Sequence, residues 1–148
     1  MVFAAVADAV LVIKRGGIKM GMKENAFAYI DAHRSEMLKM WEELVSIDSG
    51  SDYKPGVDKV VARVADVLTA MGGKTRIVEH ANAGNAVVSE FGDCANKPFI
   101  VLTGHLDTVF SNPEETKARP FTIKDGRAYG PGALDMKGGV TLATFGLQ

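Results

Sequence analysis

The chain has 148 residues, a mass of 15.8 kDa and a formal net charge of −1. This length predicts one domain. The 17 basic and 18 acidic residues leave no basic surplus of the kind that nucleic-acid binders carry. The single cysteine, Cys94, excludes an internal disulfide framework and a cysteine-based zinc site, and favours a cytoplasmic protein.

The N-terminal segment is apolar over residues 2–13, apart from one aspartate. This run is too short for a membrane-spanning helix, which needs about 20 residues. Basic residues follow the run at 14–19, whereas a secretory signal places them before it. Because Met20 and Met22 directly precede a helical pattern, we interpret residues 1–22 as a loose leader or a mis-called start. A short strand or helix added to the domain is the alternative.

Two amphipathic helices are predicted next. Apolar residues at spacings of three and four favour a helix over 27–45, with a break near Ser35. A second apolar stripe favours a helix over 57–71, which Gly72 and Gly73 would end.

The pattern then changes to strands. Short β-type runs lie at 75–79 and 86–91, and the continuous apolar run at 99–102 predicts a strand buried on both faces. Asp125-Gly126 predicts a hairpin turn between 121–123 and 127–129. Residues from Val140 onward predict a helix that is too short to be finished, so the sequence looks cut. Helices followed by a mixed set of strands predict a layered α/β domain.

His105 and Asp107 directly follow the predicted central strand. Residues i and i+2 of an extended chain share a face, so the two side chains should lie together at the sheet edge where α/β proteins place ligands. At this spacing Asp107 is better suited to orient a metal-bound His105 than to be a second ligand. The alternative is a solvated histidine beside a loop-capping aspartate.

Asp135 lies in the glycine-rich segment 130–139, between the hairpin and the last helix. The positive end of that helix would keep its carboxylate ionised, and an ionised carboxylate can bridge two divalent cations. Alternatively, Asp135 only caps the helix. A phosphate-binding loop is disfavoured, because the spacing fits neither GxGxxG nor the Walker pattern.

The two segments GHLDTV and GPGALDMKGG place His105 and Asp135 30 residues apart. In this order and spacing they resemble the dinuclear zinc exopeptidase family of glutamate carboxypeptidases, aminoacylases and succinyl-diaminopimelate desuccinylases. The segment LVSIDSGS at 44–51 is also similar to that family. The resemblance extends from about residue 27 to the end of the chain.

This resemblance implies site roles and a fold. His105 would bind one zinc, Asp107 would orient His105, and Asp135 would bridge two zinc ions through a turn whose 135–136 peptide bond is cis. Cobalt or manganese could replace zinc. Lys137, with the two glycines after it, would support the turn. Residues 23–148 would form the N-terminal part of a truncated, layered zinc-peptidase-like catalytic domain with a mixed, largely parallel central sheet.

The family's general-base glutamate, its remaining metal ligands and its dimerisation domain follow the bridging aspartate at distances that this chain does not reach. Glu114 and Glu115 precede Asp135, and we interpret them as solvated surface. His33 and His80 lack ligand spacing to His105 and are interpreted as structural or exposed.

The expected function is therefore that of the N-terminal portion of a metallopeptidase, inactive as this fragment. Its complete parent would hydrolyse the amide bond of small peptides or N-acyl amino acids in a glutamate-carboxypeptidase-like reaction. It would be a homodimer that uses two zinc ions and binds neither nucleic acid nor membrane. The alternatives are a non-catalytic interaction module, a pseudogene remnant or a nucleotide-binding domain.

Overall fold

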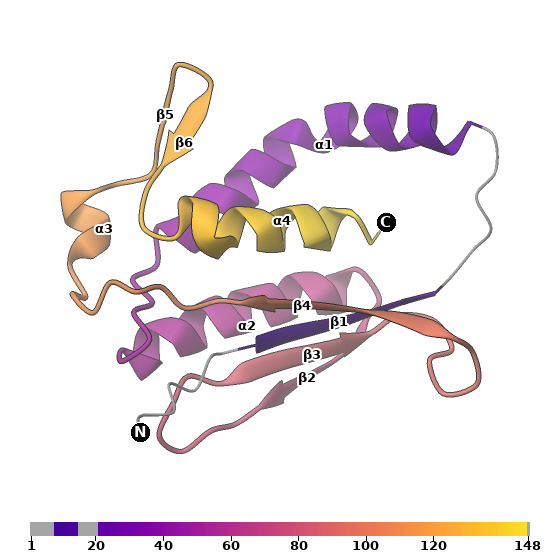
Figure 1. Ribbon diagram of the computed structural model, residues 1–148, viewed down its shortest axis with the longest axis horizontal. Coiled ribbons are helices and arrows are strands. Elements are labelled where there is room, and N and C mark those ends of the chain that lie inside the picture. Colours follow the sequence, from indigo (N-terminus) through magenta and orange to yellow (C-terminus); the bar gives the residue numbers. More distant parts are fainter. Residues whose placement is uncertain (1–7, 15–20, 148) are drawn as a thin grey trace.

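A computed structural model describes residues 8–14 and 21–147 of the chain. In these residues four strands form one sheet in the order β2-β3-β1-β4, and Figure 1 shows the strands one beside another. The strands are β1 (Asp8–Lys14), β2 (Lys74–Val78), β3 (Ala86–Glu90) and β4 (Phe99–His105). A separate hairpin projects away from this sheet.

The pairing of the strands corrects one expectation. β1 is parallel to β3 and antiparallel to β4, and β2 is antiparallel to β3. The mixed α/β architecture is present, but a largely parallel sheet is not confirmed, because two of these three pairings are antiparallel. Residues 79–85 are too few for the crossover that a parallel β2–β3 pair would need, which takes about a dozen residues or more.

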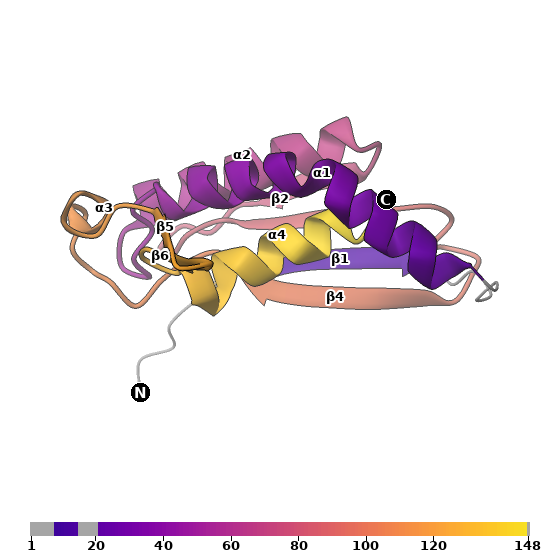
Figure 2. The same ribbon diagram turned by 90° about the horizontal axis from the view of Figure 1, so that it is seen from above.

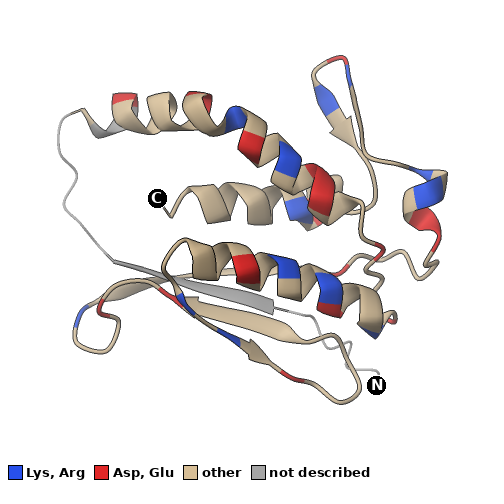
Figure 3. Cartoon of the chain, turned by 180° about the vertical axis from the view of Figure 1, so that it is seen from behind, with Lys and Arg blue, Asp and Glu red and all other residues tan. Residues whose placement is uncertain are grey.

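Three helices, α1 (Met22–Val45), α2 (Lys54–Ala70) and α4 (Gly138–Phe145), lie on one side of the sheet, as Figure 2 shows. α2 packs on β2 and β3, and α4 contacts both α1 and β4. α4 carries no charged residue, whereas acidic and basic residues are mixed along α1 and α2 in Figure 3. An uncharged helix fits a position between another helix and a sheet.

One apolar core joins these helices to the sheet. Burial of these side chains supplies the main stabilising free energy, at roughly 25 cal/mol per Å² of apolar surface. The buried members of this core come from α1, α2, β3, α4 and the segment after β4: Met40, Leu44, Val57, Val60, Val61, Val64, Ala65, Leu68, Val87, Leu106 and Val140.

The two predicted long helices are present. α1 is one continuous helix of 24 residues, so the predicted break near Ser35 is wrong, although the ribbon bends about halfway along its length in Figure 1. Ser35 has a moderate helix propensity and lies almost three turns from the nearer end, so it need not interrupt the helix. α2 ends as predicted, with Gly72 at φ +86° and the amide of Gly73 donating to the Leu68 carbonyl at 3.0 Å.

The burial predicted for β4 is wrong. Phe99, Ile100 and Val101 are 52%, 46% and 47% exposed. β4 is an edge strand among the described strands, and no described helix covers the face opposite α2 and α4. A continuous apolar run is thus left open to solvent.

The predicted hairpin is confirmed as β5 (Thr122–Lys124) and β6 (Arg127–Tyr129). Asp125 at φ +51° and Gly126 at φ +72° supply the two left-handed residues that a tight two-residue turn needs. A short helix, α3 (Glu115–Ala118), precedes the hairpin.

Part of the N-terminal segment is a strand. Residues 8–14 form β1, which matches the alternative of an added strand for that stretch; the rest of 1–20 lies outside the described residues. The expected start at Met20 or Met22 stays a prediction. No helix in the described part of the chain is long and apolar enough to cross a bilayer.

Candidate metal centre

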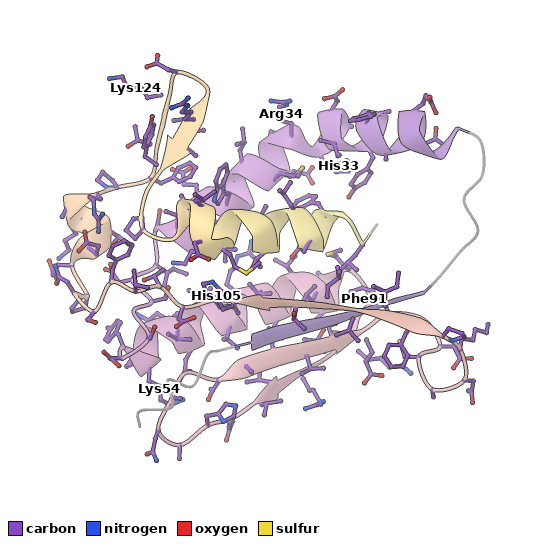
Figure 4. The ribbon with its side chains drawn as sticks, in the orientation of Figure 1. His33, Arg34, Lys54, Phe91, His105 and Lys124 are labelled. Atoms are coloured by element: carbon purple, nitrogen blue, oxygen red, sulfur yellow. The ribbon has the colours of Figure 1, made fainter. Side chains whose placement is uncertain are left out.

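β4 carries the candidate site at its C-terminal end. His105 is the last residue of the strand, Leu106 after it is fully buried in the core, and Asp107 is 8% exposed. The alternation sends Leu106 inward and leaves the two polar side chains on the other face. Figure 4 shows His105 at this end of β4, well away from His33 on α1.

The His105 ring lies between two carboxylates. Its Nδ1 is 3.2 Å from Asp107 Oδ1 and 3.1 Å from the Asp107 carbonyl oxygen. Its Nε2 is 2.8 Å from Asp135 Oδ1. The structure therefore brings together all three predicted site residues, with Asp107 and Asp135 at opposite nitrogens of one imidazole.

Asp135 reaches this position through an irregular turn. The chain kinks within residues Ala133–Lys137, where Asp135 and Met136 have non-helical backbone angles, and the Asp135–Met136 peptide bond is cis, as predicted. Gly132, at φ +71°, opens the turn beside Thr108, where a Cβ would lie 2.6 Å from the Thr108 methyl carbon. Glycine is therefore needed for the turn to approach the segment that follows His105.

The environment raises the pKa of His105 above its ordinary 6.5. Burial acts to lower this pKa, but the hydrogen bond to Asp135, the bond to the Asp107 carbonyl and the negative charges of both carboxylates outweigh it. The imidazolium is thus stabilised between two anions.

The loop that follows α1 binds the Asp107 carboxylate through a hydrogen bond. Ser51 Oγ donates to Asp107 Oδ2 at 2.5 Å, and the Ser51 amide donates to the Thr108 carbonyl at 2.9 Å. The Thr108 amide in turn donates to the Ser49 carbonyl at 2.8 Å. Ser51 fixes the second oxygen of Asp107, so its first oxygen faces His105. The sequence analysis missed this contact, and only the similarity of LVSIDSGS to the family's early segment pointed to this loop.

The sequence analysis also did not foresee the burial of Lys137. Its side chain is fully buried, and its Nζ donates to the Ile47 carbonyl at 2.9 Å. Burial lowers the pKa of Lys137 to about 8, against the raising effect of the Asp48 and Asp107 charges. The sequence analysis expected Lys137 to support the turn, but sequence spacing alone cannot reveal that its side chain is buried.

The three site residues line a cavity of about 270 Å³ that also includes Ser51 and Phe110. It is open on one side, where the Asp135 side chain is 80% exposed. Val109 and Leu134, which are 83% and 93% exposed, also line this cavity.

Other acidic residues and histidines lie apart from this site. Glu114 pairs with Lys117 and is exposed, whereas Glu115 pairs with Arg119 and is only partly exposed. His33 Nδ1 bonds to the Tyr29 carbonyl, and His80 is exposed near the end of β2. In residues 8–14 and 21–147 no group of three or more His, Cys, Asp or Glu side chains could hold a metal ion.

His105 and Asp135 fit part of a zinc site. Imidazole nitrogen and carboxylate oxygen are zinc ligands, and a carboxylate behind the other ring nitrogen is the usual support for a zinc-bound histidine. Two such ligands are fewer than the three or four that a zinc site requires.

Sequence comparison assigns the chain to a class. A profile of the peptidase family M20/M25/M40 matches residues 101–148, which include all three site residues. These residues thus have the sequence pattern of a peptidase. The chain belongs to peptidase family M20/M25/M40, which confirms the family that its motifs resemble.

Individual relatives give the extent of the match. The chain is 30% identical over 138 residues to the β-Ala-His dipeptidase of Rattus norvegicus, covering 81% of this chain and 28% of the relative. It is 30% identical over 121 residues to the succinyl-diaminopimelate desuccinylase of Delftia acidovorans, covering 77% and 31%. A desuccinylase of Rickettsia rickettsii is 33% identical over 107 residues, covering 67% and 27%. The chain therefore spans less than a third of these relatives.

Proposed function

We propose that the chain is the N-terminal portion of a zinc-dependent metallopeptidase that hydrolyses the amide bond of small peptides or N-acyl amino acids. The placement of His105 carries this proposal: its Nε2 lies 2.8 Å from Asp135, and its Nδ1 lies 3.2 Å from Asp107. Family membership supports hydrolysis. Two relatives, named as a dipeptidase and a desuccinylase, support a small amide substrate.

Each side chain has a separate task in this proposal. His105 Nε2 and the Asp135 carboxylate would hold zinc, and Asp135 would be the bridging ligand between two ions. Asp107 accepts the Nδ1 proton of His105, so the lone pair of the neutral ring is on Nε2 and faces the site. Bound zinc would supply Lewis-acid polarisation of the scissile carbonyl and a lowered pKa for its water.

No described residue is assigned to the other steps of the reaction. Proton removal from the attacking water requires a general base within hydrogen-bond reach, and Glu114 and Glu115 do not line the cavity. We therefore propose that this chain alone is inactive. The homodimeric parent, its cytoplasmic location, the carboxypeptidase-like specificity and the choice of zinc over cobalt or manganese rest on the family resemblance, with the lone cysteine as added support for the location.

Zinc titration of the purified chain by calorimetry tests the site. We expect weak binding that His105→Ala abolishes. His33→Ala, which removes an imidazole from α1, is the matched control and should leave binding unchanged. Equal binding by the chain and its His105→Ala variant would reject the proposed site.

A hydrolysis assay tests the proposed inactivity. With zinc, cobalt or manganese added, the chain should release no product from a β-alanyl dipeptide or an N-succinyl amino acid. Metal-dependent turnover that disappears in His105→Ala would show that the described residues suffice for catalysis.

A further inference from the structure

The side chain of Asp135 has one hydrogen-bond partner in the described part of the chain. It is 80% exposed, and its carboxylate bonds to His105 Nε2. That ring nitrogen is also the one that would bind a metal ion, and it cannot bond to the carboxylate and to the metal at the same time. The position of Asp135 at a loaded site therefore depends on the backbone turn that carries it.

One carbonyl group closes this turn. The Ala133 carbonyl oxygen accepts a hydrogen bond from the amide of Gly138, which joins the chain before Asp135 to the chain after it. The same oxygen accepts the indole N–H of Trp41, on α1, at 3.1 Å. A carbonyl oxygen has two lone pairs, so these two donors satisfy it fully. Trp41 thus binds the turn at the point where its two ends meet.

Two glycines of the glycine-rich segment lie directly against α1. A Cβ at Gly138 would lie 2.7 Å from a backbone oxygen and 3.1 Å from the Trp41 ring. A Cβ at Gly130 would lie 2.5 Å from a methyl carbon of Val45. Because neither position has room for a side chain, both glycines allow the segment to approach α1 closely. The contact with α1 explains two glycines that the chemistry of the site does not use.

We propose that Trp41 is a positioning residue for Asp135: its indole N–H holds the Ala133 carbonyl and so sets where the Asp135 carboxylate lies relative to His105. Trp41 does not line the cavity that contains His105, so it acts through the backbone of the turn and not as a ligand. Its effect on zinc binding rests on the proposed function, whereas its hold on the turn does not.

Amide hydrogen exchange in the metal-free chain tests the hold on the turn. Trp41→Phe keeps an aromatic ring but removes the N–H donor. We expect the Gly138 amide to exchange about tenfold faster or more in this variant, relative to the amides of α2. Met40→Ala is the matched control, because it removes a buried side chain from the neighbouring position of α1 and should leave this ratio unchanged. An unchanged ratio in Trp41→Phe would overturn the proposal.

Zinc titration tests the effect on the metal centre. Loss of one neutral hydrogen bond should weaken zinc binding by Trp41→Phe about 2–10-fold in calorimetry. Met40→Ala should melt at a lower temperature and bind zinc as the wild type does. Trp41 is the single tryptophan of the chain, so its indole N–H gives one NMR signal. Zinc should shift this signal in the wild type but not in His105→Ala, whereas a tryptophan that only stabilises the fold would not respond to zinc.

The outcomes separate this proposal from the proposed function. If the wild-type chain binds no zinc, the proposed function fails, and hydrogen exchange alone decides whether Trp41 holds the turn. If the wild type and Trp41→Phe bind zinc equally, the proposed site stands and the role of Trp41 is rejected.

A second variant keeps the test decisive if Trp41→Phe does not fold. Gly138→Ala disturbs the same contact from the other side, because its methyl group would press on the Trp41 ring. Gly146→Ala, at the opposite end of α4, is the matched control. Weaker zinc binding by Gly138→Ala alone is the expected result, and equal zinc affinity of these two variants would overturn the proposal.

Discussion

The ammonium group of Lys137 donates a hydrogen bond to the carbonyl oxygen of Ile47, across 90 positions of the chain. Lys137 is two residues after Asp135, and Ile47 begins the loop whose Ser51 holds Asp107. This bond therefore closes a ring of contacts around the site, from Asp135 through Lys137 to the loop and back to His105. A buried ammonium has several kcal/mol of desolvation to offset, so it is an expensive way to join two loops.

Replacement of Lys137 should change the free energy of unfolding only a little at pH 7. Burial lowers the pKa of Lys137 from 10.5 to about 8, so the charged form is destabilised in the fold by roughly 3 kcal/mol. Lys137→Met removes this penalty but leaves the Ile47 carbonyl without its donor, which costs about 1–3 kcal/mol. At pH 7 the free energies of unfolding of the two proteins should agree within about 2 kcal/mol, as measured by urea denaturation with chelator present.

The pH dependence of that difference is the sharper prediction. Below pH 8 the lysine is charged in both states, and the burial penalty is fully present. Between pH 8 and 10.5 the unfolded chain holds the proton and the folded chain does not, so the wild-type free energy of unfolding rises with pH relative to that of Lys137→Met. Unfolding of both proteins at pH 7 and pH 10 checks this, and a difference that stays constant would contradict it.

Asp107 should support zinc binding without being a ligand. Asp107→Asn keeps the shape of the side chain but removes the charge that holds the Nδ1 proton of His105. Loss of such a supporting carboxylate typically weakens metal binding about 10–100-fold. Calorimetry with zinc should show a loss of this size, compared with complete loss in His105→Ala. Asp125→Asn in the hairpin turn is the control, because asparagine tolerates the positive φ there; a similar loss in this variant would contradict a specific role for Asp107.

Local patterns predicted most of the elements, and they failed where distant parts of the chain meet. Apolar periodicity located α1 and α2, and Asp125-Gly126 located the hairpin, because these signals depend on neighbouring residues. The exposure of Phe99 could not be predicted, since it depends on which elements cover β4. For the site, the resemblance of the two motifs to the family predicted that His105 and Asp135 meet, but the bond from Ser51 crosses 56 positions without any periodic signal.

Ser51 should affect the site mainly through Asp107. Ser51→Ala removes the hydrogen bond to Asp107 Oδ2 and a longer one, at 3.1 Å, to the Thr108 carbonyl oxygen, and the carboxylate then loses the contact that sets its orientation. A charge-assisted bond of this type is worth about 1.5–3 kcal/mol, part of which water can replace. We expect zinc binding to weaken about 3–10-fold, with little change in melting temperature. Ser111→Ala removes an exposed hydroxyl at 3.4 Å from Asp52 and serves as the control, and an equal effect of the two variants would argue against the role of Ser51.

The open apolar surface of β4 should make the chain self-associate. Phe99 and Val101 lie on the same face of an edge strand and are about half exposed, so two copies can pair or stack there. Phe99→Lys with Val101→Lys places two charges on that edge and should shift the chain to monomer in sedimentation velocity at concentrations where the wild type forms larger species. Thr122→Lys with Ile123→Lys adds the same charge to the hairpin and should not. A wild-type chain that is already monomeric and melts cooperatively would show that this face is tolerated in water.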